Sequence, residues 1–346
     1  MRRGLISRSL TELPDAVLDA RVARVRAALA AASLDALVVY TNNTRPAGVS
    51  WLTGFVPYWS EALLVLPRER EPVLVVALTY RVKTWIERVS RVADVIHTPR
   101  IGLEAARLLA DIKADAAVGI VDRDELAAGI VADLREKGAR LTLRDATGLF
   151  AALRAEADPA EIALTMQATS IAQRALAKAS GKSLAGMLAA VEGHARELGA
   201  EEVYLAAAPD LARDARLVRI EGETRLGDSF ALRATVAYKG SWVRLVRTFA
   251  PSEGGAEAAR FAAAVAALPS ARGFAGCSTW LVEGCRTTQP LAPLMGSRLS
   301  EGSVPLATRS LVSVQASFEH DGRRMLIGAP ALLGAPGEAA SLLVRL

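Results

Sequence analysis

The stretch GDSFALRATVAYKGSWVRLVRTF, residues 227–249, decides the fold of the C-terminal half of the chain. Apolar side chains alternate with others on both sides of Lys239-Gly240, which predicts a hairpin of two antiparallel strands over residues 230–250. Two more strands are predicted at residues 311–318 and 324–333, and helices at residues 184–199 and 257–269. The C-terminal half is therefore expected to be an α+β domain in which helices pack on an antiparallel sheet.

Helices and strands alternate in the N-terminal half, which is typical of an α/β domain ending near residue 150. The apolar periodicity predicts helices at residues 16–32, 102–113 and 124–138, and strands at residues 34–40, 60–67, 72–78 and 116–122. Asp158, Pro159 and Glu161 then have the spacing of a helix N-terminus with a capping box. A long helix is predicted from this point to about residue 180.

Composition excludes several classes of protein. The 346 residues suffice for about two domains, and the net charge of +5 is spread evenly, with 16 basic and 14 acidic residues from residue 201 onward. Nucleic-acid binding needs clustered positive charge, so it is not expected. No apolar run approaches the ~18 residues of a membrane span, and the first residues lack the apolar stretch of a signal peptide. A cytoplasmic protein that binds no membrane is expected.

Three stretches together resemble the creatinase and aminopeptidase P family: SWLTGF at residues 50–55, Arg154 followed by Glu161, and residues 227–249. The resemblance covers nearly the whole chain. It implies an α/β N-terminal domain over residues 1–153 and an α+β pita-bread domain over residues 154–346. Because members of this family commonly dimerise, it also implies a homodimer or a heterodimer with an active paralogue.

Metal-using members of the family hold two ions with two aspartates of this hairpin, a histidine and two glutamates. The resemblance implies that Arg233 and Arg244 stand at the two aspartate positions. An arginine side chain stays charged and offers no lone pair, so it cannot replace a carboxylate ligand.

The other three metal ligands have no counterpart either. No histidine lies between His194 and His320, and the two glutamates fall at Gln315 and within residues 327–329, most simply at Gly328. We therefore expect no metal ion, no cofactor and no metallopeptidase activity.

A metal-free, creatinase-like mechanism would require a histidine on the strand before the Gly-Asp turn. Residues 206–228 contain none. If the chain is catalytic, His320 is the one histidine near the expected cleft and the base to test. The alternative for Glu319, His320 and Asp321, which precede Gly322, is a turn between two strands.

Arg233 and Arg244 are predicted to point to the same face of the hairpin, with Arg247 nearby. A buried guanidinium needs an anion, which could be an acid of this chain, an acid of a partner, or a ligand carboxylate or phosphate. The alternative is that these arginines lie at the solvated rim of a cleft. Other candidate ligand-binding residues are Tyr238, Trp242, Gln315 and Arg324.

Three functions stay open at this point. The chain could be a non-catalytic subunit, or it could bind a small anionic or amino-acid-like ligand. It could also be a metal-independent enzyme, such as a C–N bond hydrolase or an enzyme of specialised metabolism.

Overall fold

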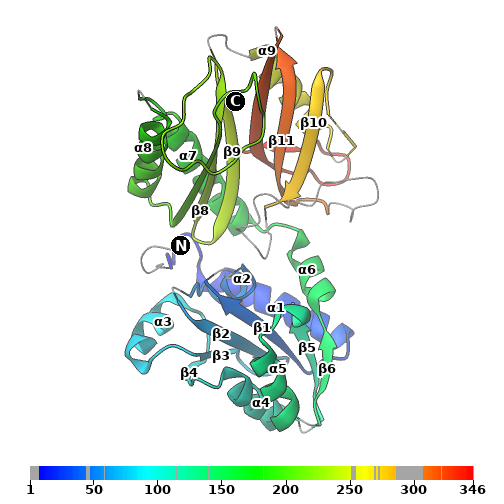
Figure 1. Cartoon of the computed structure of the whole chain (residues 1–346). Helices are drawn as coiled ribbons and strands as arrows, with labels where there is room; N and C mark the ends of the chain where they lie inside the picture. Colours follow the sequence, from blue (N-terminus) through cyan, green and yellow to red (C-terminus); the bar gives the residue numbers. More distant parts are fainter. Residues whose placement is uncertain are drawn as a thin grey trace. The chain divides into compact units, whose positions relative to one another are not determined.

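The computed structural model describes residues 8–43, 47–57, 59–113, 115–138, 140–181, 183–250, 255–268, 270–271, 273–285, 307–320 and 322–345. These residues form two compact units, one up to Arg154 and one from Ala155 onward. None of the helices in this part of the chain combines the length and the hydrophobicity that crossing a membrane requires. Figure 1 shows the chain coloured along its sequence.

The first unit contains a six-stranded sheet in the order β4-β3-β2-β1-β5-β6. Its strands are β1 (Ala36–Asn42), β2 (Glu61–Pro67), β3 (Val73–Val76), β4 (Asp94–His97), β5 (Ala117–Val121) and β6 (Thr142–Asp145). Its helices are α1 (Asp15–Ala31), α2 (Ala47–Thr53), α3 (Lys83–Val89), α4 (Ile101–Ile112), α5 (Ala128–Lys137) and α6 (Thr147–Ala155). Short 3-10 turns lie at Tyr80–Val82 and Arg123–Glu125.

Both faces of this sheet are buried, which explains the unbroken apolar run in β1. Leu37 and Val39 pack with residues of α1, α2, α3 and α6, whereas Ala36 and Val38 pack with residues of α4 and α5. Successive residues of a strand point to opposite faces, so a strand covered on both sides needs apolar residues throughout.

The second unit contains a seven-stranded sheet, counted over the described residues, in the order β10-β11-β12-β9-β8-β7, with β13 paired to β12. Its strands are β7 (Glu202–Ala208), β8 (Phe230–Tyr238), β9 (Ser241–Phe249), β10 (Cys277–Gly284), β11 (Leu311–His320), β12 (Arg323–Leu332) and β13 (Ser341–Leu342). Its helices are α7 (Pro159–Leu176), α8 (Leu184–Glu197) and α9 (Gly255–Ala266).

The predicted hairpin is present as β8 and β9, and its turn explains the sequence Lys239-Gly240. Tyr238 pairs with Ser241, and both turn residues have positive φ, 47° at Lys239 and 81° at Gly240. A two-residue turn of this type matches the twist of the strands and favours glycine. The register of the hairpin is thereby fixed.

The start of α7 is also as predicted. The Asp158 carboxylate accepts a hydrogen bond from the backbone N–H of Glu161 at 2.9 Å, and the Glu161 side chain accepts one from the backbone N–H of Asp158 at 3.3 Å. With Pro159 at the first helical position, this is a complete capping box. The helix ends at Leu176, earlier than the predicted residue 180.

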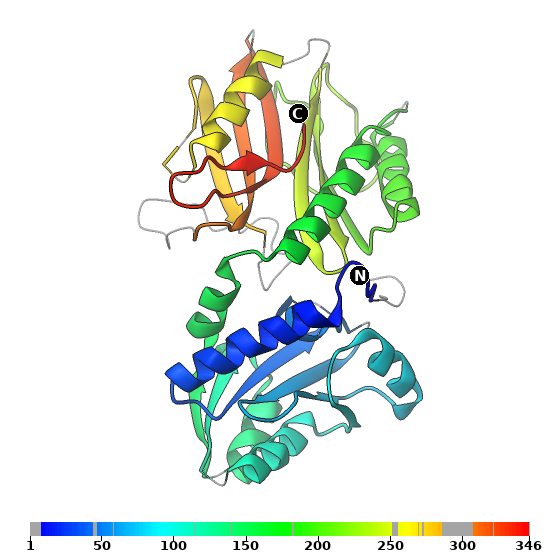
Figure 2. The same ribbon diagram turned by 180° about the vertical axis from the view of Figure 1, so that it is seen from behind.

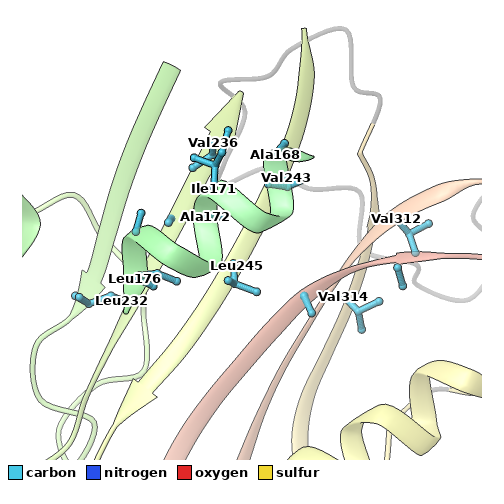
Figure 3. Packing of buried hydrophobic residues seen from close by; sticks show 14 of the residues in the cluster. Ala168, Ile171, Ala172, Leu176, Leu232, Val236, Val243, Leu245, Val312 and Val314 are labelled. Carbon is cyan, nitrogen blue, oxygen red and sulfur yellow. The ribbon is translucent and has the colours of Figure 1, made fainter. Parts of the chain in front are cut away.

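Helix α7 covers one face of the second sheet. Ile171, Ala172 and Leu176 are buried against Leu232 of β8 and Leu245 of β9, and Figure 3 shows this helix lying over the two strands. We call this side of the sheet the helix face. The opposite side, onto which Arg233 and Val246 point by strand alternation, is called the inner face.

Several elements differ from the sequence predictions. Residues 123–125 form a 3-10 turn, so α5 begins only at Ala128. Eight elements were not predicted, because each is short or irregular in its apolar spacing. They are the strands β4, β6, β7, β10 and β13 and the helices α2, α3 and α6.

Candidate functional site

The candidate site lies on the inner face of the second sheet, along a row of directly paired residues. Arg233 of β8 pairs with Val246 of β9, Val246 pairs with Gly328 of β12, and Gly328 pairs with Gln315 of β11. Directly opposed residues of antiparallel strands point to the same face. Arg244 lies two residues before Val246, so it shares this face.

Arg244 forms an ion pair across the inner face with Glu283 of β10. The two side chains are only 12% and 6% exposed. A buried arginine needs an anion, and for Arg244 this anion is Glu283 of the same chain. Breaking such a buried pair is costly because the remaining charge stays uncompensated.

The ion pair spans several strands of the sheet. Strands β11 and β12 lie between β9 and β10, so the two residues are three strand spacings apart. At roughly 4.8 Å per spacing this is about 14 Å along a flat sheet. The two long side chains together span this distance and meet above the intervening strands.

Arg233 lies beside this pair and is also buried, with 8% of its surface exposed. Burial lowers the pKa of the Arg233 guanidinium, the neighbouring charge of Arg244 lowers it further, and Glu283 opposes both effects. Arginine nevertheless stays protonated in proteins. Two guanidinium groups and one carboxylate thus meet on the inner face.

The described residues do not fit a two-metal centre. The positions that the resemblance implies for metal ligands hold Arg233, Arg244, Gln315 and Gly328, and Glu283 is engaged by Arg244. Across the described part of the chain, no group of three or more His, Cys, Asp and Glu side chains is arranged to hold a metal ion. These side chains therefore cannot bind the metal ions that a metal-dependent reaction would need.

Gly328 occupies a position with no room for a side chain. A Cβ atom added there would lie 2.9 Å from Cγ2 of Val246 and 3.2 Å from the carbonyl oxygen of Val314. Gly328 and Val246 form the register pair that joins β12 to β9. The glycine therefore allows the two halves of the sheet to approach each other.

The structure corrects two of the predicted site positions. Arg247 and Tyr238 do not lie on the inner face, because each is an odd number of residues from the inner-face positions of its own strand. Tyr238 packs against the helix-face core. Arg247 is exposed on the helix side, with its guanidinium 5.3 Å from the ring centre of Phe249.

Two other predicted residues, Trp242 and Arg324, lie on the inner face but apart from the ion pair. Trp242 stacks on Tyr204 of β7, with ring centres 5.8 Å apart. Arg324 of β12 helps to lower the pKa of Asp214, which is lowered mainly by hydrogen bonds from Arg216. His320 ends β11 opposite Arg323, and its side chain lies outside the described residues, as does Asp321.

Glu283 is the residue that sequence reasoning missed. It lies in CSTWLVEG, residues 277–284, a β-branched and aromatic stretch between α9 and the last hairpin. An acid within such a stretch was the available signal, because a buried strand carries a charge only where a partner neutralises it.

Comparison with known proteins identifies both units. Residues 21–155 match the creatinase/prolidase N-terminal domain. This part of the chain is therefore a creatinase/prolidase N-terminal domain. Its whole fold is that of the prolidase from Pyrococcus horikoshii OT3, with 16% identity and a TM-score of 0.70 over 94% of this chain and 98% of that one. The second unit accordingly has the pita-bread fold, as predicted.

Two further solved structures share the creatinase/prolidase fold. The X-Pro aminopeptidase from Thermotoga maritima MSB8 is 13% identical, with a TM-score of 0.70 over 94% of this chain and 97% of that one. The N-terminal domain of the FACT complex subunit SPT16 from chickpea, Cicer arietinum, is 14% identical, with a TM-score of 0.61 over 95% and 96%. No curated protein sequence matches this chain.

Proposed function

We propose that this chain is a metal-free, peptidase-inactive homologue of Xaa-Pro peptidases. The single observation that carries the proposal is the cluster of Arg233, Arg244 and Glu283 on the inner face, at the place where the family resemblance implies metal ligands. Guanidinium charge here takes the place of metal charge but offers no lone pair to a metal or a proton. The cluster holds the sheet together and does not activate water.

The proposed role is that of a non-catalytic, cytoplasmic subunit, either in a homodimer or with an active paralogue. Support comes from the N-terminal domain of chickpea SPT16, which has this fold and belongs to a subunit of the FACT complex. Co-purification from the native host is the test of the assembly. Isolation of the chain with a metal-binding relative favours the heterodimer, and isolation as two copies of this chain alone favours the homodimer.

The central prediction concerns metal and peptidase activity. After incubation with Mn²⁺, Zn²⁺ or Co²⁺ and dialysis, the protein is expected to retain no more metal than the dialysis buffer, because two arginines repel cations from the inner face. Metal analysis and hydrolysis of Xaa-Pro dipeptides measure this, with the Pyrococcus horikoshii prolidase as a positive control. Two bound metal ions per chain together with dipeptide hydrolysis would contradict the proposal.

A second candidate is a binder of a small anionic or amino-acid-like ligand on the inner face. The observation that favours it is the buried Nε atom of Arg244, which has no hydrogen-bond acceptor among the described residues. A carboxylate or phosphate would supply a further acceptor for this guanidinium group.

We expect Arg233→Gln to weaken binding of such an anion at least about tenfold, because a hydrogen bond to a charged group contributes roughly 1.5–3 kcal/mol. Calorimetric titration of acetate, glycine and phosphate measures the effect. Arg219→Gln is the matched control, since Arg219 is 84% exposed in the same unit. Equal binding by both variants, or no binding by the unmodified protein, rejects this candidate. No described contact favours the metal-independent enzyme.

A further inference from the structure

A cavity of about 400 Å³ lies in the second unit, away from the inner-face cluster. It opens where β9 and β12 separate, next to their single register pair Gly328–Val246. The size of this cavity lies within the range of about 300–1,000 Å³ typical of small-molecule sites.

The cavity belongs to the helix face. Leu245 lies in the core beneath α7, and Leu176 of α7 lines the cavity beside it. The gap between the strands is bridged by Thr248, whose hydroxyl donates to the carbonyl oxygen of Leu326 at 2.7 Å and accepts from its N–H at 2.8 Å. The cavity also reaches Val246 and Leu326 between the two strands, but none of the three residues of the inner-face cluster lines it.

The walls of the cavity are mostly apolar. Besides Leu176 and Leu245, they include Phe318, Met325, Ile327 and Val344. Burial of a ligand here would gain about 0.8 kcal/mol for each CH₂ group removed from water. The cavity therefore suits the hydrocarbon or aromatic part of a molecule.

The charged groups that line the cavity are all positive among the described residues. Arg247 and Arg345 are both exposed there, and none of the described lining residues is acidic. The C-terminal segment is held in place because the Gln173 amide donates a hydrogen bond to the backbone carbonyl of Arg345 at 3.0 Å. Figure 2 shows this segment crossing the helix side of the unit.

We propose that this cavity binds an amphipathic monocarboxylate, with a chain of roughly eight to ten carbons inside it and its carboxylate between Arg247 and Arg345. Guanidinium groups form strong, paired hydrogen bonds to carboxylates, whereas the apolar walls select a long hydrocarbon part. The proposal does not depend on the function of the inner-face cluster.

Calorimetric titration with hexanoate, octanoate and decanoate tests the proposal on the full-length protein. Decanoate is expected to bind saturably with a Kd below about 1 mM, and each added CH₂ group is expected to strengthen binding about threefold to fourfold. Decanol, which has the same chain without the charge, is expected to bind at least about tenfold more weakly.

Two variants locate the site. Arg247→Gln is expected to weaken decanoate binding at least about tenfold, and Ala258→Trp, which fills the cavity from α9, is expected to abolish it. Arg219→Gln is the control with an exposed arginine outside the cavity and should bind as the unmodified protein does. A melting temperature for each variant confirms that it is folded.

Several results would overturn the proposal. One is the absence of saturable decanoate binding, and another is equal affinity for decanol and decanoate, which would mean that the arginines do not recognise the carboxylate. Unchanged binding by both Arg247→Gln and Ala258→Trp would place the ligand elsewhere.

Discussion

Replacing Glu283 by glutamine is expected to lower the free energy of unfolding by about 3–5 kcal/mol. The substitution keeps the size of the side chain but removes the negative charge that Arg244 needs in its buried position, where Arg233 adds a second positive charge. Urea unfolding of the full-length protein, followed by circular dichroism, measures the loss.

The control for this variant is Glu221→Gln in the same unit. Glu221 pairs with Arg219 at 3.5 Å, but the two side chains are 79% and 84% exposed, so a change below about 1 kcal/mol is expected. The double variant Arg244→Met/Glu283→Met should lose less stability than Glu283→Gln, because it removes the cation together with the acid. A loss below about 1 kcal/mol for Glu283→Gln would show that the pair does not hold the sheet.

The second large effect is expected at Gly328. Placing there the glutamate that the family resemblance implies should destabilise the protein by more than about 3 kcal/mol and leave it insoluble. The added Cβ alone would meet Val246 and the backbone of Val314, and the carboxylate would have to be buried as well. Soluble yield and urea unfolding are the measurements.

Two further variants make this prediction specific. Gly328→Ala adds only the Cβ atom and is expected to cost about 1–3 kcal/mol, so its stability stays measurable. Gly284→Glu introduces the same side chain into β10 of the same sheet, where an added Cβ meets no described atom within 4 Å, and should cost less than about 1 kcal/mol. Equal losses for Gly328→Glu and Gly284→Glu would contradict the steric argument.

The parts of the fold that could be predicted from sequence are those with strong local signals. The alternation around Lys239-Gly240 predicted β8 and β9, and the spacing of Asp158 and Glu161 predicted the capping box of α7. In both cases a few neighbouring residues determine the structure through turn geometry or capping.

The candidate site could be predicted only in part because its contacts are not local. Arg244 and Glu283 are 39 residues apart in sequence and meet across two intervening strands. The periodicity of apolar residues does not predict a contact of this kind. Arg247 was expected near Arg244, but it lies on the opposite face of the sheet. The sequence could have shown this, because residues three apart on a strand point to opposite faces. The helix-face cavity depends on where β9 and β12 separate, which follows from the three-dimensional packing alone.

The close contact between Gly328 and Val246 also has an evolutionary consequence. If the ancestor of this chain held metal ions here, as the proposed function implies, a single mutation at position 328 would not restore a ligand. Residue 246 would first have to become smaller, and both arginines would have to change as well. Every intermediate would carry a strained sheet or an uncompensated buried charge. Under the proposed function, such a loss of metal ligands would therefore be effectively irreversible by stepwise mutation.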